Sequence, residues 1–145
     1  MNLVKLVFAS LISYATAEQL ILDPPASAAS GKPVAMVWIH GMQCKPQAYK
    51  TLGQEIQNVA ASQGLKLWIG LPEFPFDAPE PVLIDHYVQE TIGDLSKHGF
   101  SGNNLFIGAH SLGGVMSQNY VASKPDMFKG LILTGSGILN NTYSI

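Results

Sequence analysis

The chain has 145 residues, a formal net charge of −2 and a single cysteine, and 47% of its residues are hydrophobic while 12% are charged. This charged fraction is about half of the ~25% usual in globular domains, which excludes a disordered or highly charged segment. All eight basic residues are lysines. A net negative charge without arginine does not fit a nucleic-acid-binding protein. One cysteine, Cys44, cannot build a disulfide framework or a cysteine-based metal site, and the length suits one domain of modest size.

Residues 1–17 have the pattern of a secretory signal peptide. Lys5 supplies a positive charge, residues 6–15 are mostly apolar, and Ala15-Thr16-Ala17 matches an A-x-A cleavage site. The apolar run is shorter than the ~20 residues that cross a membrane, and no later stretch is long enough. We therefore expect a secreted protein without a transmembrane segment; the alternative is that residues 1–17 form a buried first helix or strand. The triplet at 140–142, Asn-Asn-Thr, matches a glycosylation site.

Apolar runs alternate with helical spacings along residues 34–134. Near-continuous apolar runs, typical of parallel strands covered on both faces, predict strands at 34–39, 65–71, 104–109 and 129–134. Helices are predicted at 46–63, 82–98 and 112–123; in the first, Tyr49, Leu52, Ile56 and Val59 recur at spacings of three and four. This order predicts an α/β fold, with a mostly parallel sheet and helices on both faces.

The most informative motif is the 108–114 turn, Gly-Ala-His-Ser-Leu-Gly-Gly, between the third predicted strand and the third predicted helix. Ser111 has a small residue two positions before it, Ala109, and another two positions after it, Gly113, as a very tight strand-to-helix turn requires. Such a turn exposes the serine hydroxyl and aims the Leu112 N–H at a developing oxyanion. Ser111 as an ordinary helix N-cap is the alternative. The strand before it and the helix after it favour a nucleophile.

The first predicted strand ends in Ile39-His40-Gly41-Met42. Gly41 lets the backbone approach a ligand closely, and the Met42 N–H is the expected second donor to an oxyanion. By itself this segment is typical of an ordinary turn at the end of a strand. Together with the Ser111 turn, it favours the functional interpretation.

The pair WIHGM (38–42) and GAHSLGG (108–114), in this strand and helix order, resembles the α/β-hydrolase fold of the esterase and lipase type over about residues 34–137. The resemblance implies a small-molecule ester or lipid substrate, and no cofactor or metal. It implies that Ser111 is the nucleophile and that the Met42 and Leu112 amides form the oxyanion hole. The residues that would support the turn are His40, Gly41, Ala109, His110 and Gly113. Ala109 replaces the first glycine of the G-x-S-x-G motif, where the steric argument asks only for a small residue.

In this family an acid and then a histidine follow the serine. After Ser111 this chain has one acidic residue, Asp126, and no histidine. Among the earlier histidines, His86 is the one candidate for an alternative base near the site, because it follows the proline-rich loop 72–81, which leaves the carboxyl end of a strand. His98 is expected near a helix end remote from that edge, and His110, as the neighbour of Ser111 on a tight turn, is expected to point in a different direction. Phe74 and Phe76 of that loop are candidates for a substrate pocket.

We therefore expect residues 18–33 to be an N-terminal segment and residues 34–145 the N-terminal part of an α/β-hydrolase domain, incomplete at its C-terminus. The triad acid and histidine would then lie beyond residue 145. Two functions stay open: an exported serine hydrolase, or a catalytically incomplete fragment or binding domain. The last predicted strand leaves an exposed sheet edge, which favours self-association.

Overall fold

The computed structural model of the chain describes residues 19–139. The strands are β1 (Leu20–Leu22), β2 (Lys32–Ile39), β3 (Leu65–Leu71), β4 (Leu105–His110) and β5 (Gly130–Thr134). The helices are α1 (Lys50–Ser62), α2 (Pro81–Lys97) and α3 (Leu112–Ala122), with short 3-10 turns η1 (Ala26–Ala28), η2 (Pro46–Tyr49) and η3 (Pro75–Asp77). The predicted signal peptide and the 140–142 triplet lie outside the described residues.

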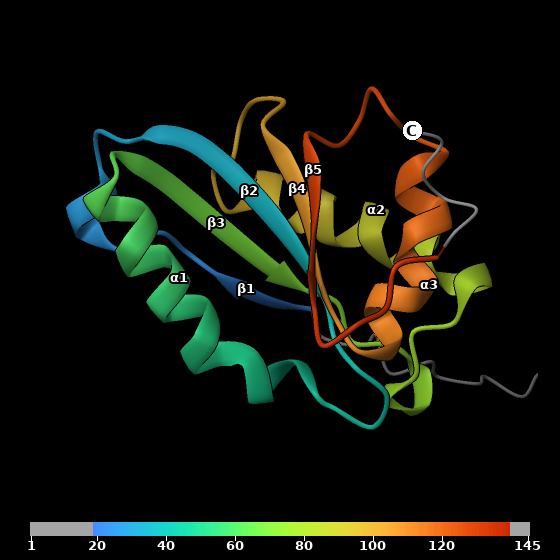
Figure 1. The fold of residues 1–145 in the computed structure, drawn as a ribbon. Helices are drawn as coiled ribbons and strands as arrows, with labels where there is room; N and C mark the ends of the chain where they lie inside the picture. Colours follow the sequence, from blue (N-terminus) through green and yellow to red (C-terminus); the bar gives the residue numbers. More distant parts are fainter. Residues whose placement is uncertain (1–18, 140–145) are drawn as a thin grey trace, which may run out of the picture.

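The five strands form one sheet in the order β1-β3-β2-β4-β5 (Figure 1). The strands β2 to β5 run parallel to their neighbours, whereas β1 is antiparallel to β3. The predicted α/β fold with a mostly parallel sheet is confirmed. The segment 18–33 contributes β1, which pairs with the β3 residues Leu71, Gly70 and Ile69.

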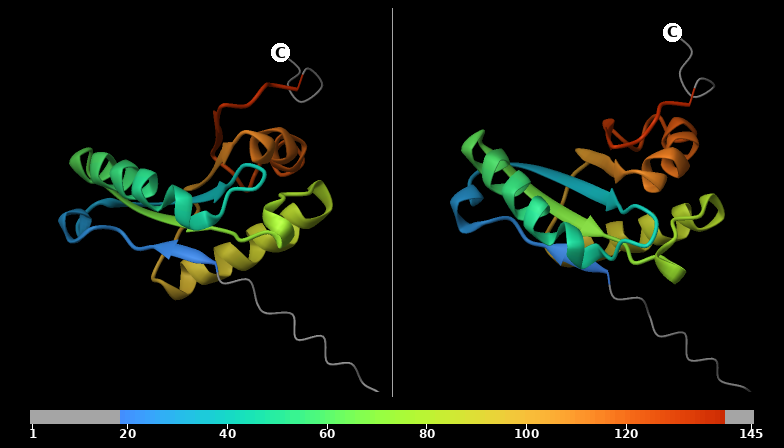
Figure 2. Two further views of the ribbon diagram at one scale, coloured as in Figure 1. Left: turned by 90° about the horizontal axis from the view of Figure 1, so that it is seen from below. Right: turned by 60° about the horizontal axis from the view of Figure 1, so that its bottom comes forward.

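Helices cover both faces of the sheet, as Figure 2 shows for α1 and α2. On the first face, alternate residues of β2 and β3 such as Trp38 and Ile69 pack with Ile56 and Ala60 of α1. On the second face, Ile107 of β4 packs with α2 and α3 in the larger hydrophobic core. Because both faces are covered, the central strands are almost continuously apolar.

The helix predicted at 46–63 is divided in the structure, and the face that it turns to the sheet includes Ile56 but differs in part from the predicted one. Its first four residues form η2, and α1 begins at Lys50. Leu52 and Val59 are 47% and 64% exposed, while Gly53 and Gln57 are buried. A Cβ atom on Gly53 would lie 2.6 Å from Leu22 Cδ1. The missing side chain therefore lets the helix approach the sheet closely, and this close approach sets which face is buried.

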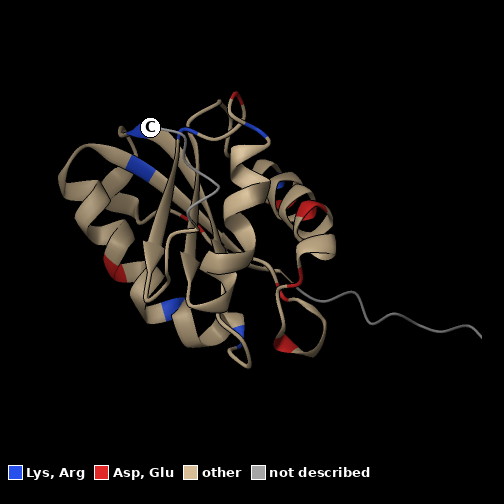
Figure 3. Ribbon diagram, turned by 45° about the vertical axis from the view of Figure 1, so that its right-hand side comes forward, with Lys and Arg blue, Asp and Glu red and all other residues tan. Residues whose placement is uncertain are grey.

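Charged residues are few in the described part of the chain, and lysines and acidic residues are spread over several elements and loops (Figure 3). In the same part of the chain, no group of three or more His, Cys, Asp or Glu side chains could hold a metal ion. No helix between residues 19 and 139 is long and apolar enough to cross a membrane.

Candidate active site

Ser111 lies at the carboxyl end of β4, directly before α3, with φ 50° and ψ −121°. A positive φ is uncommon for a residue with a side chain and costs on the order of 1–3 kcal/mol. Two hydrogen bonds hold this conformation. The Ser111 N–H donates to the Thr134 carbonyl at 3.0 Å, and the Ser111 carbonyl accepts from the Val115 N–H at 3.2 Å. The sharp strand-to-helix turn predicted from the small residues is therefore present.

The 40–44 loop lies against the 108–114 turn because β2 and β4 are neighbouring parallel strands, with Ile39 opposite Ala109. A Cβ atom on Gly41 would lie 3.3 Å from Ser111 Cβ and 2.9 Å from His110 Nδ1. Residue 41 is therefore in contact with the serine turn, and the missing side chain makes this contact possible.

The N–H group of Met42 belongs to the 40–44 loop, and that of Leu112 belongs to the 108–114 turn. Leu112 is the first residue of α3, where backbone N–H groups have no partner within the helix. Among residues 19–139, neither N–H donates a hydrogen bond to another residue. The loop is fixed on the far side of Met42, where the Gln43 N–H donates to the Asp77 carbonyl at 2.8 Å.

His40 is completely buried beneath the loop. Its Nδ1 lies 2.7 Å from the Gly41 carbonyl oxygen, which assigns the ring proton to this nitrogen. Burial lowers the pKa of His40 below its ordinary value, although the Gly41 carbonyl and the carboxylates of Asp77 and Glu73 oppose the shift. His40 is therefore a neutral residue that supports the backbone of the loop from below.

The two candidate pocket phenylalanines lie in different surroundings. Phe74 is 1% exposed and packs edge-on against His40, with ring centroids 5.4 Å apart, and against Tyr87. Its side chain is part of the core rather than the wall of an open pocket. Phe76 is 98% exposed and has a φ of 56°. Only Phe76 is therefore accessible to a substrate.

The histidines considered as alternative bases are engaged elsewhere. His86 lies on the exposed side of α2 and pairs with Glu90, with 3.6 Å between Nε2 and Oε2, while His98 pairs with Asp23 at 2.9 Å. His110 bonds through Nδ1 to the Tyr49 hydroxyl at 2.8 Å. Within the described residues, none of these side chains hydrogen bonds to Ser111. The expectation that His86 lies near the serine receives no support from these contacts.

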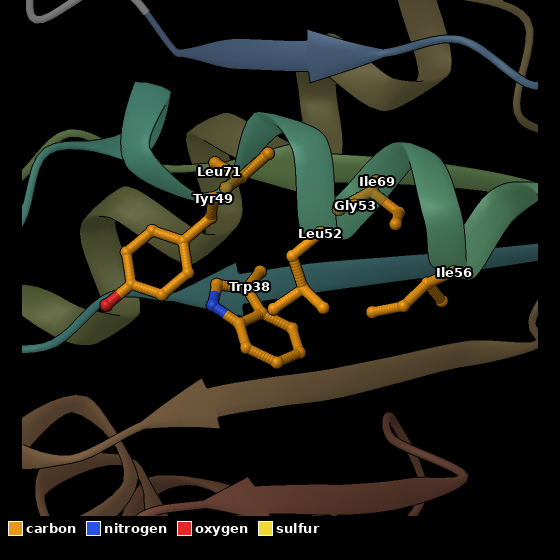
Figure 4. Close-up of a pocket in the computed structure, with 7 residues that line it drawn as sticks. All are labelled: Trp38, Tyr49, Leu52, Gly53, Ile56, Ile69 and Leu71. Carbon is orange, nitrogen blue, oxygen red and sulfur yellow. The ribbon is translucent and has the colours of Figure 1, made fainter.

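Tyr49 lies at this site, although its spacing in the sequence predicts only an apolar position on a helix. Its hydroxyl contacts Gly41 on one side and His110 on the other. The ring also forms one end of a small apolar pocket between α1 and the sheet (Figure 4). The residues that line this pocket are Trp38, Tyr49, Leu52, Gly53, Ile56, Ile69 and Leu71. Ser111 is not among them, so this pocket is not the candidate active site.

No family model matches the sequence, and no curated protein matches it either. Solved structures do match. A fluorophosphonate-binding serine hydrolase from Staphylococcus aureus has 16% identity and a TM-score of 0.57, and the match covers 78% of this chain and 48% of that one. An alpha/beta hydrolase enzyme from a lagoon-sediment metagenome has 16% identity, 86% and 52% coverage and a TM-score of 0.55.

A monoacylglycerol lipase from Paleococcus ferrophilus has 17% identity and a TM-score of 0.55, and the match covers 84% of this chain and 44% of that one. The chain thus spans about half the length of these proteins. Identities this low establish the fold alone. Residues 19–139 therefore have the α/β-hydrolase fold, which these serine hydrolases and lipases share.

Proposed function

We propose that the chain is an exported serine hydrolase, or a portion of one, that cleaves carboxylic esters with Ser111 as its nucleophile. The observation that carries this proposal is the left-handed backbone of Ser111 on a turn between a buried strand and a helix. A strained residue with a nucleophilic side chain is a functional candidate, because this turn presents the hydroxyl at the carboxyl end of the sheet.

In the proposed reaction, the Ser111 Oγ attacks the carbonyl carbon of a small-molecule ester or lipid. The Met42 and Leu112 N–H groups donate to the oxyanion that forms, and the loss of one such donor typically costs ~10²–10³-fold in rate. The Ser111 proton passes to a general base. The family resemblance assigns that base to a histidine later in the chain than Ser111, and none occurs up to residue 145.

The test is labelling of the full chain with a fluorophosphonate reporter, together with hydrolysis of a short-chain p-nitrophenyl ester. We expect Ser111 to be labelled in the wild type, slowly where no histidine base is present, with ester turnover following the labelling rate, and we expect no labelling in Ser111→Ala. Ser123→Ala is the matched control, because Ser123 lies beyond the end of α3 and bonds to the Tyr120 carbonyl. Labelling that persists in Ser111→Ala would contradict the assignment of the nucleophile.

The second candidate is a hydrolase-like chain without catalysis, such as a binding domain. It is favoured by the contacts of His86, His98 and His110, none of which bonds to Ser111 within residues 19–139, and by the position of Asp126, which is exposed between α3 and β5. A folded wild-type chain that binds a fluorescent ester analogue but never reacts with the fluorophosphonate would select this candidate.

Export forms a separate part of the proposal. It is supported by the charge, apolar run and A-x-A site of residues 1–17. Expression in a eukaryotic secretory host should release a protein whose N-terminus is Glu18. Mass spectrometry of the medium and of the cells tests this, and an intracellular protein that retains residues 1–17 would contradict it.

A further inference from the structure

We propose that Tyr49 is a positioning residue whose hydroxyl joins the 40–44 loop to the 108–114 turn and so holds the oxyanion donors and the nucleophile in register. This inference rests on the proposed serine hydrolase function. Tyr49 does not touch the reacting atoms itself. It acts through Gly41 and His110, the neighbours of Met42 and Ser111 in the sequence.

The Tyr49 hydroxyl is hydrogen bonded to both segments, and we call this pair of bonds the join. The Gly41 N–H donates to the phenol oxygen at 3.0 Å, and the same oxygen lies 2.8 Å from His110 Nδ1. The two bonded residues are 69 positions apart (110 − 41) and lie on the neighbouring strand ends of β2 and β4. Among residues 19–139, this hydroxyl is the single side-chain group that hydrogen bonds to both segments.

The Tyr49 ring is held in place by its neighbours. It packs against Trp38 with centroids 6.0 Å apart and against His110 with centroids 5.7 Å apart. Figure 4 shows the ring beside Trp38, with its oxygen pointing away from the apolar pocket. Because these contacts restrict the ring, they also restrict the position of its hydroxyl relative to the two backbone segments.

The Tyr49 hydroxyl can bond to both segments in either of two proton arrangements. Partial burial raises the pKa of Tyr49 above its ordinary value, so the phenol keeps its proton at neutral pH. One lone pair of the oxygen accepts the Gly41 N–H. The bond to His110 uses either the phenol proton, donated to Nδ1, or a ring proton on Nδ1, donated to the second lone pair of the oxygen. In both arrangements the bond shifts the nitrogen-15 resonance of His110 Nδ1, which can be measured.

Loss of the hydroxyl should loosen the site more than the fold. The Gly41 N–H would lose its acceptor, and the next N–H along the chain is the proposed oxyanion donor of Met42. A displacement of about 1 Å in such a group can cost ~10²-fold in rate. We therefore expect an effect on the reaction rate rather than on substrate affinity.

The test compares Tyr49→Phe with Tyr120→Phe in the full chain. Both variants remove one phenol oxygen, but the Tyr120 hydroxyl contacts Gln89 on the surface, away from the serine turn. Nitrogen-15 NMR of the His110 ring and exchange of the Gly41 amide report on the join, and the fluorophosphonate labelling rate of Ser111 reports on positioning. For Tyr49→Phe we expect at least tenfold slower labelling, an unchanged KM for the nitrophenyl ester, shifted His110 nitrogens and faster Gly41 exchange.

Each result decides a separate point. Labelling of Tyr49→Phe within twofold of the wild type would overturn the positioning role, even if His110 shifts. A wild type that never labels would overturn the proposed function, while shifted His110 nitrogens and faster Gly41 exchange in Tyr49→Phe would still establish the join. If Tyr49→Phe unfolds, the nitrogen-15 spectrum of the His110 ring in the wild type still tests the bond to Tyr49. A His110 Nδ1 resonance without the shift of a hydrogen-bonded nitrogen in that spectrum would overturn the proposed bond.

Discussion

Gly113 lies in the first turn of α3, where the helix passes directly over the end of β2. A Cβ atom at this position would lie 2.3 Å from the His40 carbonyl oxygen and 2.7 Å from the Ile39 carbonyl oxygen. Both contacts are with backbone, so a rotamer change cannot relieve them. We expect Gly113→Ala to destabilise the chain by about 2 kcal/mol or more, in the range of core overpacking, and to slow Ser111 labelling. Urea unfolding measures the first effect.

Gly93→Ala is the matched control for Gly113→Ala. Gly93 lies inside α2, and a Cβ atom there would meet no heavy atom within 4 Å. At an exposed position inside a helix, alanine is more favourable than glycine by roughly 0.8–1 kcal/mol, so this substitution should raise the free energy of unfolding. Equal effects of the two substitutions would show that the close approach at Gly113 does not constrain the turn.

At the scale of single residues, the sequence predicted the serine turn but not the tyrosine beside it. Ser111 could be located because its small neighbours, Ala109 and Gly113, are required within five consecutive residues by one local turn. Tyr49 is 61 positions from His110, and its role depends on packing between two strand ends. An isolated tyrosine in a helical spacing carries no signal for such a contact.

At the scale of elements, Gln57 connects α1 to both β1 and β3. Its Nε2 lies 2.8 Å from the Leu22 and Leu67 carbonyl oxygens and 3.1 Å from that of Asp23. We expect Gln57→Met to cost about 1–3 kcal/mol, because buried carbonyls lose a donor while the volume is nearly retained. Since β1 is only three residues long, it should open first, and hydrogen exchange at residues 20–22 measures this.

Gln54→Met provides the comparison on the same helix. Gln54 is exposed, and surface substitutions of this kind usually change stability by less than ~0.5 kcal/mol. If Gln57→Met and Gln54→Met leave exchange at residues 20–22 equally protected, Gln57 does not hold β1 in place.

Prediction of the elements succeeded where the pattern was continuous and local. The apolar run 65–71 predicted the bounds of β3, and the helix predicted at 82–98 corresponds to α2, whose buried residues include Ile84, Val88 and Leu95. By contrast, β1 is too short to show any periodicity. The buried face of α1 was read only in part from apolar spacing: Ile56 packs on the sheet as predicted, but the buried positions are Gly53, which allows close approach, and Gln57, whose amide is bonded.

At the scale of the whole molecule, the two edges of the sheet differ. Within the described residues, β1 is a three-residue edge, while β5 is a five-residue edge whose outer side has no neighbouring strand. The Ser111 N–H donates to the Thr134 carbonyl, and His110 lies opposite Thr134. The backbone groups of Thr134, Ile132 and Gly130 therefore point toward β4, and by alternation those of Leu131 and Leu133 point outward. Ile132 is central in β5 and 45% exposed. Antiparallel pairing of two β5 strands about Ile132 would satisfy these outward groups.

We therefore expect the chain to self-associate through β5 at micromolar concentrations, because an open apolar edge strand is a template for pairing. Ile132→Lys should shift the population toward monomer, since a lysine on an edge strand opposes pairing. Val59→Lys adds the same charge at an exposed apolar position of α1, away from the edge. Sedimentation velocity over a concentration series measures both variants against the wild type. Equal association of Ile132→Lys and Val59→Lys would place the contact elsewhere, and a wild type that stays monomeric would exclude it.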